Sequence, residues 1–121
     1  MDHKKFVLIQ TELLSNNKTK FEAFGHNLVV EKELDTALWK LSTTLYQEEG
    51  RLPAGIEACV SPTGIFRWQT KGPHLILDRS TNAVALIHTI HPIKEYSPFK
   101  ELLHNFASIA GEWKQILSEM E

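Results

Sequence analysis

The stretch from Ser97 to Met120, SPFKELLHNFASIAGEWKQILSEM, is the strongest structural signal in this chain. Its apolar residues recur every three or four positions, which is the spacing of one face of an α-helix. They are Phe99, Leu102, Leu103, Phe106, Ile109, Ala110, Trp113, Ile116, Leu117 and Met120. Ser97 is a favoured N-cap residue, and Pro98 suits the first helical position because it lacks a backbone N–H. The sequence therefore predicts a long C-terminal helix whose wide apolar face packs on a sheet or on another chain.

The segments that precede this helix have the composition of strands. Ala83–Ile90 (AVALIHTI) is apolar on nearly both faces, as in a central, covered strand. Ile65–Thr70 and His74–Asp78 are expected to join it in a meander, because Gly, Pro, Ser, Thr and Asn separate the three runs. Ile56–Val60 is expected to be a further short strand or extended segment.

The N-terminal third predicts a helix followed by two strands. Phe6, Ile9 and Leu13 have helical spacing, which predicts a helix over residues 2–14. Ser and Asn at 15–17 favour a turn. Lys20–Val30 is interpreted as two short strands around Gly25-His26-Asn27.

Residues 31–49 fit two interpretations. Leu34, Ala37, Leu38, Leu41 and Leu45 form a helical stripe, with Asp35 or Thr36 as N-cap and Gly50 beyond the end. Trp39, Leu41, Thr43 and Leu45 also alternate with polar residues, as in a half-buried strand. Leu34 and Leu38 fit the helix alone, so we favour a helix here. The predicted fold is a single α+β domain over residues 1–121, ordered helix, strands, helix, antiparallel meander and long C-terminal helix.

Composition narrows the class of protein. The 121 residues are 42% hydrophobic and 23% charged, as in a globular domain. Thirteen basic and fifteen acidic residues give a net charge of −2, which argues against nucleic acid as a partner. No apolar run has the ~20 residues of a membrane span, and the N-terminal stretch does not resemble a signal peptide. The single cysteine, Cys59, suits a reducing compartment, so we expect a cytoplasmic location without membrane association.

The sequence offers little for catalysis. His88 and His91 lie around a predicted strand end, without Asp, Glu or Cys to complete a metal site, and are interpreted as a partly exposed pair. Cys59 lies between Ala58 and Val60, which indicates a buried thiol rather than a nucleophile. No phosphate-binding or zinc motif is present. We therefore expect no catalytic residues, no metal and no cofactor.

The large apolar side chains suggest a different role. Phe66 and Trp68 share one face of their predicted strand, and Trp39 and Trp113 add two more indoles. A domain of this size has limited interior volume, and two amphipathic helices already compete for one sheet. Some of this apolar surface is therefore expected to belong to an interface, where aromatic residues are enriched.

The predicted order of elements, together with one stretch of sequence, resembles the class I chaperones of bacterial type III secretion systems. The stretch runs from Gly72-Pro73-His74-Leu75-Ile76-Leu77-Asp78, through a polar turn, to Ala83-Val84-Ala85-Leu86-Ile87. Ser97-Pro98-Phe99 and a long helix with Trp113 follow, and Gly50-Arg51-Leu52-Pro53 resembles the break that many members have before their second sheet segment. The likeness is strongest over residues 72–117. The family usually has three strands before its middle helix, where this sequence predicts two.

The resemblance implies a dimeric chaperone that binds an extended segment of a secreted effector or gatekeeper protein without ATP. The dimer would be a homodimer or a heterodimer with a related small chaperone. The expected partner-binding residues are Phe66, Trp68 and Leu75 on the meander and Phe6 and Ile9 on the first helix, chosen by their polarity. The alternative is a Roadblock-like or longin-like dimerisation module that binds a folded partner.

Overall fold

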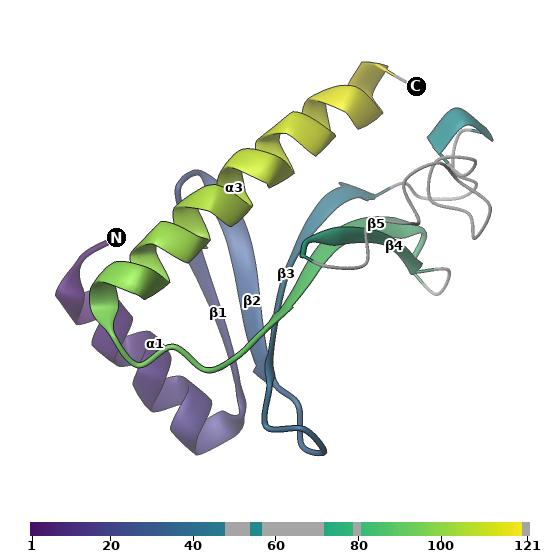
Figure 1. Cartoon of the computed structure of the whole chain (residues 1–121). Helices are drawn as coiled ribbons and strands as arrows, with labels where there is room; N and C mark the ends of the chain where they lie inside the picture. The colour runs from purple at the N-terminus through teal and green to yellow at the C-terminus, as the bar shows by residue number, and fades with distance from the viewer. Residues whose placement is uncertain (48–53, 57–71, 79–80, 120–121) are drawn as a thin grey trace.

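The computed structural model describes residues 1–47, 54–56, 72–78 and 81–119. They form an N-terminal helix, a five-stranded antiparallel sheet and a long C-terminal helix (Figure 1), which confirms the predicted α+β class. The elements are α1 (His3–Asn16), β1 (Lys18–Ala23), β2 (His26–Lys32), β3 (Trp39–Gln47), β4 (His74–Asp78), β5 (Ala83–Ile90) and α3 (Tyr96–Glu119). Residues 54–56 also have helical backbone.

The strands are arranged in the order β1-β2-β3-β5-β4, and every neighbouring pair is antiparallel. Both helices pack on the same face of this sheet, because their buried residues belong to one hydrophobic cluster with the buried residues of β2, β3 and β5. The opposite face of β1 to β3 carries polar side chains such as Lys20, Glu31 and Lys40, in the alternation expected of a sheet with one core face.

Helix α1 has well-formed caps at both ends. The Asp2 carboxylate accepts a hydrogen bond from the Lys5 backbone N–H at 2.8 Å, which is the N-cap interaction. Asn17 adopts a left-handed conformation, and its N–H donates to the Leu13 carbonyl at 3.1 Å. The helix predicted for residues 2–14 is confirmed and extends to Asn16.

The two strands predicted within residues 20–30 are present as a hairpin. Its turn has two residues, Phe24 and Gly25, both with positive φ (52° and 80°), as the tightest hairpin turns require. The turn therefore lies one residue earlier than expected, because His26 and Asn27 already belong to β2.

The helix that we favoured over residues 31–49 is wrong for residues 39–47, which form β3. This strand pairs with β2 on one side and β5 on the other, and the Thr43 hydroxyl donates to the Asn27 carbonyl at 2.8 Å. Trp39, Leu41, Thr43 and Leu45 are buried, so the two-residue alternation prevails over the helical spacing. Residues 48 and 49 lie outside the described residues.

A tight turn takes the place of the start of that helix. The Ala37 N–H donates to the Glu33 carbonyl at 3.0 Å, and the Glu33 N–H donates to the Leu38 carbonyl at 2.8 Å. Ala37 has a φ of 59°, which ends any helical continuation. Leu34, which fits the helix in the sequence pattern, is 81% exposed in this turn.

The remaining expectations are met in part. The strands predicted at His74–Asp78 and Ala83–Ile90 are confirmed with those bounds. Ile56, expected to begin a strand, instead has helical backbone, while 57–60 and the strand predicted at Ile65–Thr70 lie outside the described residues. The C-terminal helix is confirmed but begins at Tyr96, so Ser97 lies inside its first turn rather than at the N-cap.

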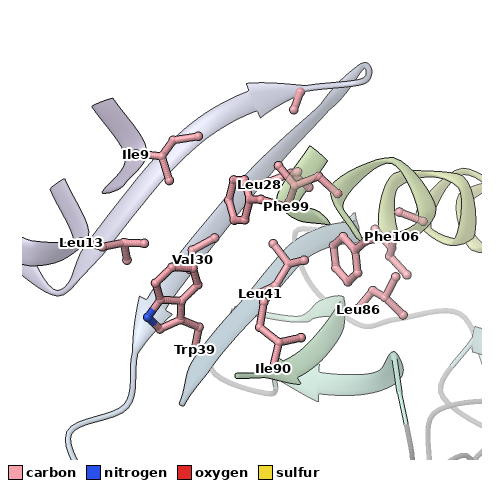
Figure 2. Packing of buried hydrophobic residues seen from close by; sticks show 14 of the residues in the cluster. Ile9, Leu13, Leu28, Val30, Trp39, Leu41, Leu86, Ile90, Phe99 and Phe106 are labelled. Atoms are coloured by element: carbon pink, nitrogen blue, oxygen red, sulfur yellow. The ribbon is translucent and has the colours of Figure 1, made fainter. Parts of the chain in front are cut away.

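The core is organised around Phe99, which is fully buried (Figure 2). Its ring lies 5.3 Å from that of Phe6 on α1 and 6.2 Å from that of Trp39 on β3, between ring centroids. Phe106 lies two turns further along the same face of α3. It is also buried and lies toward Leu41 and Leu86 of the sheet (Figure 2). Phe99 thus holds both helices and the sheet together.

Replacing Phe99 with Ala should remove this junction. We expect a loss of about 3–5 kcal/mol in the free energy of unfolding, because the substitution leaves a cavity between three elements. Leu34→Ala, at an exposed turn position, should change stability by less than about 0.5 kcal/mol. Urea denaturation followed by circular dichroism measures both, and equal effects of the two substitutions would contradict this description of the core.

Candidate partner-binding surface

The five residues expected to contact a partner have different positions. Phe6 and Ile9 are 8% and 2% exposed and belong to the core. Because they contact the sheet and α3 within the chain, the surface described below does not use them. Leu75 is half-buried on β4 and packs against the core cluster. Phe66 and Trp68 lie outside the described residues.

Three large apolar side chains are exposed on the outer side of α1, among polar residues such as Lys4, Thr11 and Glu12. Of the six large apolar residues in this helix, three are buried and three are exposed; the exposed ones are Val7 (58%), Leu8 (56%) and Leu14 (82%). Val7 and Leu14 are two helical turns apart and therefore lie on the same face of the helix. Exposed apolar side chains that share one face of a surface helix are suited to contact with another polypeptide, so the face of α1 that carries Val7 and Leu14 is a candidate for such a contact.

A pocket of about 200 Å³ lies at the C-terminal half of α1. Its lining comes from α1, from β2 and β3 with the turn between them, and from the segment that leads into α3: Gln10, Leu13, Leu14, Lys32, Ala37, Trp39, Pro92 and Lys94. Trp39 and Leu13 are buried and form its inner wall, whereas Leu14, Ala37 and Lys94 are exposed at its rim. We call this the α1 pocket. Because Leu14 lines it, the pocket is continuous with the exposed side of α1.

Two hydrogen bonds hold the walls of the α1 pocket in place. The Lys32 backbone N–H donates to the Asn17 carbonyl at 2.8 Å, which ties the end of β2 to the C-cap of α1. The Gln10 side chain donates through Nε2 to the Ile93 carbonyl at 2.9 Å, which ties the segment before α3 to the same helix. Lys32 and Lys94, the two lysines that line the pocket, therefore belong to backbone that is fixed relative to α1.

Within the part of the sheet that the structure describes, β1 and β4 are the outermost strands. An outer strand can accept an added strand from another chain through main-chain hydrogen bonds. On β1 one carbonyl, that of Glu22, already accepts a hydrogen bond from the Lys5 side chain.

The exposed Lys18–Glu31 ion pair at 3.7 Å adds little stability here, since both side chains are largely solvated.

A second cavity, of about 300 Å³, lies between α3 and the β4–β5 side of the sheet. His88 lines it together with Pro73, Leu102 and Phe106, and Glu101 and Asn105 lie at its border. Burial lowers the pKa of His88, and His74 lowers it further, so this imidazole is neutral near pH 7. His91 is exposed and does not line this cavity, so the structure does not bring the two histidines together.

Metal binding and membrane crossing have no support in the described ranges. No three His, Cys, Asp or Glu side chains among these residues are close enough to share a metal ion. Neither α1 nor α3, over its described length, is apolar enough to cross a membrane. Cys59 lies outside the described residues.

No family model, curated protein or solved structure matches this chain. The function is therefore inferred from the fold and from the surface around α1.

Sequence reasoning identified α1 as a contact element but selected its buried side. Extending the helical spacing from Val7 by seven positions reaches Leu14, so the exposed apolar side was detectable in the pattern. The α1 pocket was not detectable, because Lys94 lies more than fifty residues beyond Lys32 and Trp39 along the chain, and the pairing of Lys32 with Trp39 depends on β3 being a strand. Trp39 in particular was assigned to an uncertain segment.

His26 provides a pH-dependent contact between the β1–β2 hairpin and α3. Lys114 Nζ lies 3.0 Å from His26 Nδ1. An ammonium group can only donate, so Nδ1 accepts and the ring is neutral, with its proton on Nε2. Burial lowers the pKa of His26, and the positive charge of Lys114 lowers it further.

The stability of the protein should therefore fall on acidification. Because the folded pKa of His26 lies below its ordinary value of 6.5, the unfolded chain binds the proton more readily as the pH drops through that value. Lys114→Met removes the charge and should make the fall between pH 7.5 and pH 5.5 shallower. Urea unfolding at both pH values measures this, with Lys4→Met as a control; the same pH dependence in all three proteins would contradict the role of Lys114.

Proposed function

We propose that this chain is a secretion chaperone of the class I type III kind. It binds an extended segment of a secreted effector or gatekeeper protein in the bacterial cytoplasm and keeps that protein soluble and competent for secretion, without ATP. It acts as a homodimer or as a heterodimer with a related small chaperone. The observation that carries the proposal is the exposed apolar side of α1 beside the α1 pocket.

The order of elements supports this proposal. The resemblance in the sequence implies a helix, three strands, a middle helix, two strands and a long final helix. The third strand, absent from the sequence-based expectation, is β3, and helical backbone at residues 54–56 follows it. Three described strands before residues 54–56, where the sequence alone predicts two, support the proposal.

Energetics favour an extended client over a single small contact. Full burial of one Leu or Val side chain contributes about 1.5–3 kcal/mol. Association itself costs about 4–15 kcal/mol, so Val7 and Leu14 alone do not hold a partner firmly. A segment that follows the surface collects further contacts, from apolar side chains in pockets and from main-chain hydrogen bonds at a strand edge such as β1. Such binding needs no nucleotide hydrolysis.

The test is co-expression with candidate secreted proteins from the same bacterium. We expect one of them to be soluble only with the wild-type chain, and the double substitution Val7→Gln/Leu14→Gln to lower its soluble yield at least severalfold. Glutamine has a helix propensity equal to that of leucine and above that of valine, and it keeps the net charge, so the variant removes apolar surface without weakening the helix. Ile116→Gln, which changes an exposed apolar residue on α3, is the matched control and should leave the yield unchanged.

Hydrogen exchange on the bound client separates this proposal from the dimerisation module. A chaperone client should gain protection from exchange along one continuous segment. That segment should form no tertiary structure of its own. A partner that is folded before and after binding, or a monomeric chain that engages no secreted protein, would overturn the proposal.

A further inference from the structure

The rim of the α1 pocket is basic. Lys32 and Lys94 are among its eight lining residues, and none of the eight is acidic. We propose that this pocket selects a client segment in which one large apolar side chain lies next to an Asp or Glu residue. This inference rests on the proposed function and adds the chemical class of the sequence that is bound.

The inner part of the α1 pocket suits a single side chain. Its volume, about 200 Å³, is below the ~300–1,000 Å³ of pockets that take a whole small molecule. Trp39 and Leu13 present apolar surface there, and Trp39 is held edge-on against Phe99, with 6.2 Å between ring centroids. A Leu, Ile, Met or Phe side chain therefore finds a fixed apolar wall rather than one that must first form.

Lys32 and Lys94 both line the pocket into which this client side chain would insert. Lys32 is the last residue of β2, and its own N–H donates to the Asn17 carbonyl. Lys94 follows Ile93, whose carbonyl accepts from Gln10. Lys32 thus comes from β2 and Lys94 from the segment before α3. A peptide that inserts one side chain into the pocket brings its neighbouring residues to a lining that carries both lysines.

Neither lysine has its charge neutralised by a described carboxylate. The ion pair formed between described residues is Lys18–Glu31, away from the α1 pocket, and the nearby Glu33 carboxylate accepts from the Thr36 hydroxyl. Two cations at one small pocket repel each other, and a carboxylate between them relieves that repulsion. The alternative role for the two lysines is to stabilise the C-terminus of α1. This end carries partial negative charge, and α1 has no basic residue in its last turn. The experiment separates the two roles.

The test uses three 13-residue fluorescent peptides that differ at two positions. The acidic peptide is SGSGSELDSGSGS, the neutral one is SGSGSQLNSGSGS, and the basic one is SGSGSKLKSGSGS. Binding to the full chain is followed by fluorescence anisotropy and by the Trp39 indole N–H signal in NMR, which Trp39→Phe assigns. We expect the acidic peptide to bind roughly 2- to 30-fold more tightly than the neutral one, the range for two partly exposed charge pairs, and more weakly at high salt.

The variant Lys32→Glu/Lys94→Glu should reverse this preference, so that the basic peptide binds most tightly. Lys4→Glu/Lys20→Glu makes the same change in net charge at exposed positions outside the α1 pocket and should keep the acidic preference. Lys32→Gln/Lys94→Gln is a milder variant that removes the preference without adding charge. Thermal unfolding of each variant establishes that it is folded.

The outcomes distinguish this inference from the proposed function. Equal binding of the acidic and neutral peptides, with the Trp39 signal shifted by both, would overturn the charge preference and leave the chaperone proposal in place. Variants that lose stability but keep the acidic preference would assign the lysines to the α1 C-terminus and would also overturn the inference. Binding of none of the peptides at millimolar concentration would overturn the inference, whereas the chaperone proposal, which needs contacts along a longer segment, is tested by the co-expression experiment.

Discussion

The whole arrangement depends on the contact of Phe99 with Phe6 and Trp39. These three rings come from α3, α1 and β3, and they meet with centroid distances of 5.3 Å and 6.2 Å from Phe99. Tyr96, one turn earlier on α3, reinforces this junction, since its hydroxyl donates to the Met1 carbonyl at 2.7 Å and its ring packs on Phe6. Both helices are thereby fixed on one face of the sheet, and the rotation of α1 about its axis is fixed with them.

The rotation of α1 determines which of its residues reach solvent. With Phe6, Ile9 and Leu13 turned toward the sheet, Val7, Leu8 and Leu14 are left outside. The same contact places Trp39 as the wall of a pocket that Leu14 borders. The core therefore produces the candidate site directly, because burying one side of an apolar helix exposes the other side. The proposed peptide-binding role would give this exposed side a partner.

The elements with local signals were predictable, and those that depend on distant pairing were not. The caps and spacing of α1, the buried pattern of β5 and the apolar stripe of α3 are each contained in one short window. Trp39–Gln47 fits both the helical and the strand periodicity, and its pairing with β5, whose partner residues lie 36 to 51 positions further along the chain, decides for the strand. The same limit applies to the candidate site. The exposed side of α1 follows from helical spacing, whereas Lys94 joins the paired residues Lys32 and Trp39 only through the tertiary fold.

The most direct measurement is hydroxyl-radical footprinting of this chain, free and in complex with its client. The central claim is that another polypeptide covers the outer side of α1 and the α1 pocket during function. It predicts that oxidation of Leu14 and Leu8 falls strongly in the complex, while oxidation of Ile116 on α3 stays as it is in the free chain. A complex in which α1 is oxidised as fast as in the free chain would contradict the claim.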